Sequence, residues 1–163
     1  MKAIGINNTL IEGYLRMRLI TFIFLLILGL GCTRTKNATM KSSELIGTWV
    51  PIKQEMGGTL LPKAALENQK LIISDSTYTF IAESIDKGVV KYGDDKMDIY
   101  GKEGVNAGKH ITAIYKYENL PTGQAGEQLT VCYNLLGDSY PEAFETKGKP
   151  SRFLSVFKKE MIK

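Results

Sequence analysis

The sequence predicts an all-β domain, built either as an antiparallel up-and-down barrel or as a sandwich of two sheets. In residues 44–163, about eight short segments are rich in β-branched and aromatic residues and follow one another at roughly regular spacing. Turn-forming residues separate these segments, and only one stretch of this region has the composition of a helix. Many short strands with almost no helix are typical of barrels and sandwiches.

The predicted strands are bounded by turn signals. Gly57-Gly58 ends the first strand, and the sequence Gly93-Asp94-Asp95 forms a short hairpin loop between the fourth and the fifth. The eight predicted strands are residues 45–54, 71–74, 77–82, 84–92, 96–100, 110–117, 128–135 and 151–159. The predicted helix covers residues 61–69, where Pro62 is tolerated in the first turn and good helix formers follow. We expect it to pack across one end of the sheet.

Alternation along the strands assigns residues to an inner and an outer face. Ile111 and Ala113 share one face of their strand, whereas His110 lies on the other, which we expect to be exposed. Eight-stranded barrels are just wide enough to be filled by side chains or to hold one small ligand. A packed core and a cavity therefore remain alternatives. The aromatic residues that are candidates for lining a cavity are Tyr78, Phe80, Tyr115, Tyr117, Tyr133 and Phe153.

Residues 1–31 have the order of positive charge, apolar run and small residue that is typical of a secretory signal. The apolar run, residues 19–30, is shorter than the ~20 residues that a membrane-spanning helix needs. It ends on Gly31-Cys32, which resembles a bacterial lipoprotein signal, in which the cysteine thiol takes a diacylglycerol and becomes the new N-terminus. Met17 would give a more compact signal than Met1, so we expect translation to start there.

This resemblance divides the chain into a signal peptide (1–31), a lipidated cysteine with a polar tether (32–43) and the β domain (44–163). It implies attachment to a membrane of the bacterial cell envelope through the lipid on Cys32. Thr33 follows the cysteine where an Asp would resemble an inner-membrane retention signal, which favours the outer membrane.

The chain of 163 residues has a formal charge of +4. Loss of the signal would remove three basic residues and one acidic residue and leave a charge near +2. No run of basic residues with interleaved aromatics occurs, so the sequence argues against a nucleic-acid partner, and we expect a monomer.

Side-chain chemistry in the sequence predicts neither an enzyme nor a cofactor or metal site. With Cys32 lipidated, Cys132 is a free thiol in an apolar stretch, expected to be buried; without lipidation the two cysteines could form a disulfide. A catalytic Cys132 would need a histidine base; the chain has one histidine, His110, and we do not expect the two residues to pair. Asp94, Asp95 and Asp98 lack the spacing of a calcium loop and are expected to be solvated.

Gly47-Thr48-Trp49, at the head of the first predicted strand, resembles the Gly-X-Trp signature that opens lipocalins. The resemblance implies that Trp49 lies near the closed end of a barrel and that a basic side chain from the last strand packs over its ring. Arg152, Lys158 and Lys159 are the available partners. Arginine stacks on aromatic rings more readily, which favours Arg152.

A wider pattern resembles a bacterial lipocalin-like family of the cell envelope and extends over nearly all of residues 44–160. It includes the segments 45–49, 113–117 and 129–133 and the sequence Pro-Glu-Ala-Phe at 141–144. The resemblance implies a lipocalin-like barrel that binds a small apolar or amphipathic molecule. The alternative is a structural or protein-interaction lipoprotein with a filled barrel, which would act through the rim loops 101–109 and 120–127.

Overall fold

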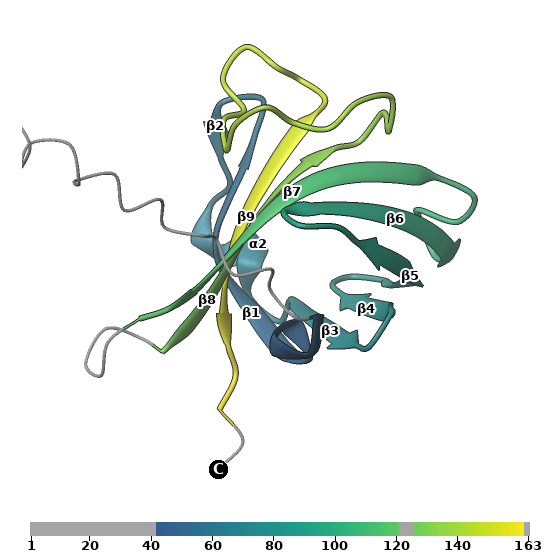
Figure 1. Ribbon diagram of the computed structural model, residues 1–163. Coiled ribbons are helices and arrows are strands. Elements are labelled where there is room, and N and C mark those ends of the chain that lie inside the picture. Colours follow the sequence, from purple (N-terminus) through teal and green to yellow (C-terminus); the bar gives the residue numbers. More distant parts are fainter. Residues whose placement is uncertain (1–41, 121–125, 162–163) are drawn as a thin grey trace, which may run out of the picture. The chain divides into compact units, whose positions relative to one another are not determined.

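The computed structural model describes residues 42–120 and 126–161, which form an antiparallel barrel (Figure 1). The signal, Cys32, nearly all of the tether and the middle of the loop 120–127 lie outside the described residues. Within the described part, no helix combines the length and the hydropathy that crossing a membrane requires. The elements are η1 (Ser42–Leu45), β1 (Gly47–Met56), β2 (Thr59–Leu60), α2 (Lys63–Leu66), β3 (Lys70–Ser74), β4 (Thr77–Ile81), β5 (Ile85–Tyr92), β6 (Lys96–Glu103), β7 (His110–Asn119), β8 (Glu127–Asn134) and β9 (Arg152–Lys159).

The sheet closes because β1 pairs with strands on both of its sides. Neighbouring strands pair in the order β1, β3, β4, β5, β6, β7, β8, β9, and β9 returns to β1, with all pairings antiparallel. The short strand β2 folds back on the end of β1 as an additional hairpin. The predicted eight-stranded up-and-down barrel is therefore confirmed, and the sandwich is excluded. Closure leaves the eight strands without a free edge along most of their length.

The antiparallel register places the connections at two ends of the barrel. We call the end with η1 and the turns 74–77 and 92–96 the closed end. The other, the open end, has the β1–β2 hairpin, the turns 81–85 and 103–110, and the long β8–β9 connection (Figure 1). The hairpin and this connection touch: Gly58 N donates to Thr146 Oγ1 at 2.9 Å, and Thr146 Oγ1 donates to the Glu55 carboxylate.

The barrel interior is the main hydrophobic core, and a smaller cluster lies on the opposite face of β7, β8 and β9. In that cluster Ile114, Cys132 and Leu154 are buried, with Tyr140 of the β8–β9 connection packed against them. Cys132 is a buried free thiol, as predicted. The run 129–136 is apolar at nearly every position because β8 has the barrel core on one face and a covered cluster on the other.

The helix α2 is a single turn and is shorter than the predicted 61–69. It ends where Glu67 leaves the helical conformation and Asn68 takes a positive φ of 64°, which turns the chain into β3. Leu66 is buried and the helix packs on β1.

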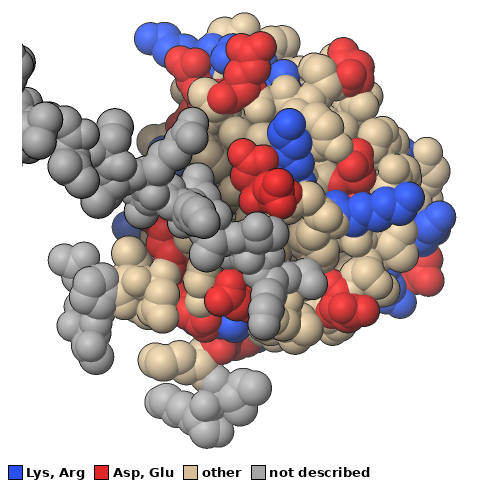
Figure 2. All heavy atoms as spheres, viewed as in Figure 1, with Lys and Arg blue, Asp and Glu red and all other residues tan. Residues whose placement is uncertain are grey.

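Charges of both signs are interspersed over the face of the molecule shown in Figure 2.

Candidate ligand-binding cavity

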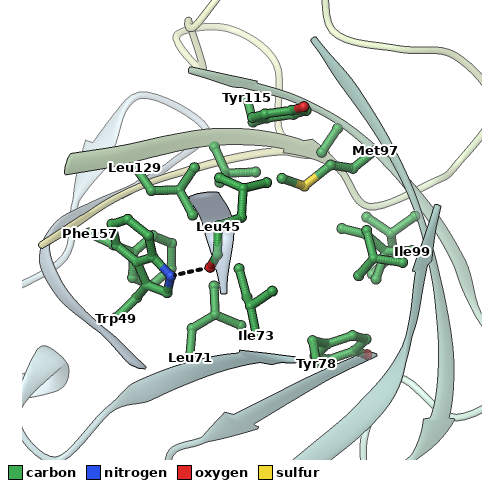
Figure 3. Close-up of a cluster of buried hydrophobic side chains, with 14 residues drawn as sticks. Leu45, Trp49, Leu71, Ile73, Tyr78, Met97, Ile99, Tyr115, Leu129 and Phe157 are labelled. Atoms are coloured by element: carbon green, nitrogen blue, oxygen red, sulfur yellow. Dashed lines mark hydrogen bonds between the residues drawn. The ribbon is translucent and has the colours of Figure 1, made fainter. Parts of the chain in front are cut away.

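The closed end of the barrel is filled by side chains around Trp49. The indole is fully buried, and its Nε1 donates to the carbonyl oxygen of Leu45 in η1 at 2.8 Å (Figure 3). Phe157 and Leu129 are buried beside it (Figure 3). The Tyr117 ring meets the indole edge-on, with 6.3 Å between the ring centroids. Leu45 of η1 and Trp49 of β1 therefore close this end as an apolar plug, in which the buried indole N–H has a hydrogen-bond partner.

Lys159, not Arg152, lies over the Trp49 ring. Its Nζ is 5.3 Å from the ring centroid and 3.0 Å from the Glu127 carboxylate. The strand register explains this, because Trp49 is opposite Lys159, whereas Arg152 begins β9 at the open end. Gly47 gives the lysine room: its φ is 142°, and a Cβ there would lie 2.8 Å from Lys159 Cε.

Beyond this plug, the barrel encloses a cavity of about 160 Å³. Its lining comes from every strand of the barrel, including Ile73 of β3, Met97 of β6 and Val131 of β8. Leu135, which follows β8 at the open end, also lines the cavity and is 36% exposed, so the lining continues to the surface there. The lining is mostly apolar and aromatic, as in small-molecule sites.

Four of the six aromatic residues predicted to line a cavity do so: Tyr78, Phe80, Tyr133 and Phe153. Tyr115 and Tyr117 face inward but belong to the filled closed end. The Tyr115 hydroxyl donates to the Gly93 carbonyl oxygen at 3.1 Å, and that of Tyr117 donates to Glu127. Packing and cavity, which the sequence left as alternatives, therefore both occur, at different heights in one barrel.

Asp86 is a cavity-lining residue that the sequence reasoning missed. It is only 3% exposed, and its carboxylate accepts hydrogen bonds from three donors. These are the Tyr78 hydroxyl at 2.8 Å, the Asn106 backbone N–H at 2.9 Å and the Asn106 side-chain amide at 3.1 Å. Gly88 allows this arrangement, because a Cβ there would lie 2.6 Å from Tyr78 Cε1. The alternation of β5 could have identified Asp86, since it shares a face with Val90 and Tyr92.

Three tyrosines add hydroxyl groups to the cavity lining. Burial and the neighbouring Asp86 raise the pKa of Tyr78 well above its usual range, and burial raises the pKa of Tyr92 to about 12. Burial, with smaller contributions from Tyr78 and Tyr92, raises the pKa of Tyr133 as well. All three phenols are therefore neutral at physiological pH. Among the described residues, the buried Tyr92 hydroxyl has no hydrogen-bond partner.

Two further polar residues line the cavity. Gln54 of β1 is 2% exposed, and its Nε2 donates to Gln69 Oε1 at 2.8 Å. This bond ties the cavity wall to the segment that follows α2. The other is Asn106, described above as a partner of Asp86. Neither residue was identified from the sequence, because one lies after a β-bulge in β1 and the other in a loop.

His110 lies on the outer face, as predicted, but it has partners there. Its Nε2 is 2.8 Å from Asp98 Oδ1, the Tyr140 hydroxyl donates to Asp98 Oδ2 at 2.6 Å, and the Tyr100 ring stacks on the imidazole. Asp98, which lies in β6 as the predicted strand 96–100 implied, was expected to be solvated, but its carboxylate is partly buried and bonded to Tyr140 of the β8–β9 connection. Within residues 42–120 and 126–161, no group of His, Cys, Asp and Glu could hold a metal ion.

The cavity is thus an apolar and aromatic space inside a closed barrel, with one buried carboxylate and several neutral polar groups in its wall. Such an arrangement can hold a small molecule and fix its orientation by a few polar contacts. Comparisons of the chain with models of protein families, with curated proteins and with solved structures found no significant match.

Proposed function

We propose that this protein is a lipid-anchored binding protein of the bacterial cell envelope whose barrel takes up a small, mostly apolar molecule. The observation that carries the proposal is the cavity of about 160 Å³ inside an otherwise well-filled barrel. Protein interiors are close-packed, and voids larger than a water molecule are few in them. An apolar molecule in this space would displace water and contact the apolar lining, which is favourable.

The size of the cavity limits the size of the ligand. An engineered cavity of about 150 Å³ in another protein stays dry and binds benzene. The cavity in this barrel is of similar volume. A ligand that is wholly enclosed would therefore have one ring or a short chain, and a longer molecule would have to extend past Leu135 at the open end.

The proposed anchor comes from the sequence. The order of arginines, apolar run and Gly31-Cys32 supports lipidation of Cys32, and the polar residues 33–43 would connect the lipid to the barrel. Eleven extended residues reach at most ~35–40 Å, enough to separate a small domain from a bilayer. The protein would then sample small molecules at a membrane surface, and the proposal includes no reaction catalysed on them.

Native mass spectrometry of the full chain, expressed in bacteria, tests the binding function. We expect an adduct that Ile99→Phe displaces, because Ile99 lines the cavity and phenylalanine would occupy part of it. Ile52→Phe is the matched control, since Ile52 is 52% exposed on the outside of β1. A protein that carries no adduct and takes up none from a lipid extract or a metabolite extract would favour a barrel that acts through its rim loops.

Labelling of growing cells with radioactive palmitate tests the anchor. Cys32→Ser should abolish incorporation into the protein, because it removes the proposed lipidated thiol. Cys132→Ser is the matched control: it replaces the other cysteine, which is buried in the domain, and should leave labelling unchanged. Equal labelling of the Cys32→Ser variant and the unmodified chain would rule the anchor out.

A further inference from the structure

The wall of the cavity has a negative group without a positive partner. Among the described residues that line it, none is Lys, Arg or His, and Asp86 is the only acidic one. Among residues 42–120 and 126–161, Asp86 forms no ion pair. Buried carboxylates are usually paired with a cation or a metal, because removing a charge from water is costly. An unpaired buried carboxylate at a cavity therefore needs a physical explanation.

Support of the β6–β7 loop explains the hydrogen bonds of Asp86 but not its charge. The three donors that reach the carboxylate, from Tyr78 and Asn106, are all neutral. An ionised carboxylate has about four acceptor positions, so one remains. A neutral side chain such as Asn could also accept from Tyr78. A negative charge at this position is favourable once a cation enters the cavity.

The rest of the lining also favours a cation. Aromatic rings from β4, β5, β8 and β9 surround the space, through Tyr78, Phe80, Tyr92, Tyr133 and Phe153. The faces of such rings attract organic cations, and aromatic cages recognise ammonium groups in this way. The hydroxyl of Tyr92, buried and without a partner among the described residues, is a further oxygen in this wall.

A carboxylate ligand, by contrast, would meet the wrong charges. Its negative group would find no Lys, Arg or His in the part of the lining that the structure describes, and it would be repelled by Asp86. The low dielectric of the interior strengthens that repulsion. Fatty acids and other organic anions therefore fit this cavity poorly, although its apolar lining would suit their chains.

We propose that the cavity binds a small organic amine in its protonated form, with the ammonium group against Asp86 and the apolar body among the aromatic rings. This inference rests on the proposed binding function and specifies the class of ligand. The volume of about 160 Å³ sets the scale of the body at a single ring.

Three probes of similar shape and different charge test this inference on the full chain in lipid nanodiscs at neutral pH. Benzylamine is cationic, benzyl alcohol neutral and benzoate anionic, and each has one ring and one further carbon. Binding is measured by NMR titration of the ligand signals, with empty nanodiscs titrated in parallel to subtract partitioning. We expect benzylamine to bind about tenfold or more tightly than benzyl alcohol, which is the scale of a charge-assisted hydrogen bond. Benzoate should not bind.

Asp86→Asn then assigns the effect to the carboxylate. The variant should bind benzylamine about tenfold more weakly and leave benzyl alcohol unchanged, because only the charged contact is lost. Asp94→Asn is the matched control: it removes the same charge from an exposed turn at the closed end and should change neither affinity. The comparison of probes in the unmodified chain does not depend on the folding of any variant.

The outcomes separate this inference from the function on which it rests. If benzyl alcohol or benzoate binds as tightly as benzylamine, the proposed class of ligand is wrong, but the barrel still binds small molecules. Equal benzylamine affinity in the unmodified chain and in Asp86→Asn would overturn the role of Asp86. If none of the three probes binds, the proposal of an amine ligand is wrong, and the proposal that the cavity binds small molecules is contradicted as well.

Discussion

The interior of the barrel is packed with side chains at the closed end and contains a cavity towards the open end. At the closed end, η1 places Leu45 against Trp49, both fully buried, and the indole N–H has a partner at 2.8 Å. Towards the open end, the inner positions surround about 160 Å³ of space, and their polar groups include the buried Asp86. The closed end is thus a packed hydrophobic core, whereas the other part of the barrel surrounds a cavity.

Side-chain size and polar satisfaction produce this difference. The closed end has the only tryptophan of the chain, and Lys159 and Glu127 cover it with a charge pair at 3.0 Å. The inner residues of the central strands at the cavity include smaller ones, such as Val90 and Val131. A barrel of eight strands can be filled or left hollow, and here the choice changes along its axis. Stability should therefore depend mainly on the closed end and ligand binding on the cavity.

The largest expected effect comes from removing the indole at the closed end. Trp49→Ala should lower the free energy of unfolding by about 3–5 kcal/mol, because it leaves a large void and the Leu45 carbonyl without its donor. Phe153→Ala, at the cavity, should cost only about 1–2 kcal/mol, because that ring is already partly exposed. Urea unfolding followed by far-ultraviolet circular dichroism measures both, and equal costs would contradict the division of roles.

Matched enlargements of apolar residues form the second test. Leu45→Phe adds volume at the closed end, where Leu45 is fully buried and is not part of the cavity lining, so we expect a loss of about 1–3 kcal/mol from overpacking. Ile99→Phe adds an aromatic ring beside the cavity and should change stability by less than about 1 kcal/mol, because the space is available. Thermal unfolding monitored by calorimetry compares the two. A larger loss for Ile99→Phe would mean that the cavity walls cannot adjust to a larger side chain.

The fold was predictable because its signals are local. Alternation of residue types and turn residues such as Gly93-Asp94-Asp95 gave all eight barrel strands, and the predicted burial of Cys132 was confirmed. The helix was predicted too long, because composition alone does not show that the chain turns at Asn68.

The site was less predictable because it depends on register between distant strands. Pairing of Trp49 with Lys159 decides which basic residue covers the indole, and no local pattern distinguishes Lys159 from Arg152. The height of each residue along the barrel decides whether it lines the cavity, which separates Tyr133 from Tyr115. Asp86 was missed although alternation placed it inside, because a charged residue is not expected at an inner position.

A smaller effect should follow from removing the charge over the indole. Lys159→Met keeps much of the aliphatic stem but loses the contact with Trp49 and the ion pair with Glu127. We expect a loss of about 1 kcal/mol, the sum of a partly exposed cation–π contact and a partly screened pair. Lys158→Met, on the neighbouring position, should cost less than about 0.5 kcal/mol. The difference in stability between the two variants should shrink in high salt, because salt screens the charges. If the difference stays the same, the loss in Lys159→Met comes from packing and not from charge.

The smallest effect concerns acid, which should loosen the open end before the closed end. A hydrogen bond from Tyr140 is the main cause that lowers the pKa of Asp98, and one from Thr146 is the main cause that lowers the pKa of Glu55. Tyr140 and Thr146 both belong to the β8–β9 connection. Since the folded pKa values lie below the unfolded ones, these contacts stabilise the protein above about pH 4 and are lost as the pH falls through the folded values.

The closed end also has a carboxylate whose pKa is lowered, that of Glu127, but the stability of this end does not depend mainly on that group. Burial raises the pKa of Glu127, yet hydrogen bonds from Tyr117 and Lys159 outweigh burial and lower the pKa overall. Hydrogen exchange between pH 6 and pH 3, corrected for intrinsic rates, should therefore show protection lost first in residues 135–151, while β1 around Trp49 stays protected by its apolar core. Tyr140→Phe should weaken this pH dependence, because Asp98 then loses the contact that lowers its pKa. Earlier loss of protection around Trp49 than in residues 135–151 would show that the charge pair, and not the buried indole, stabilises the closed end.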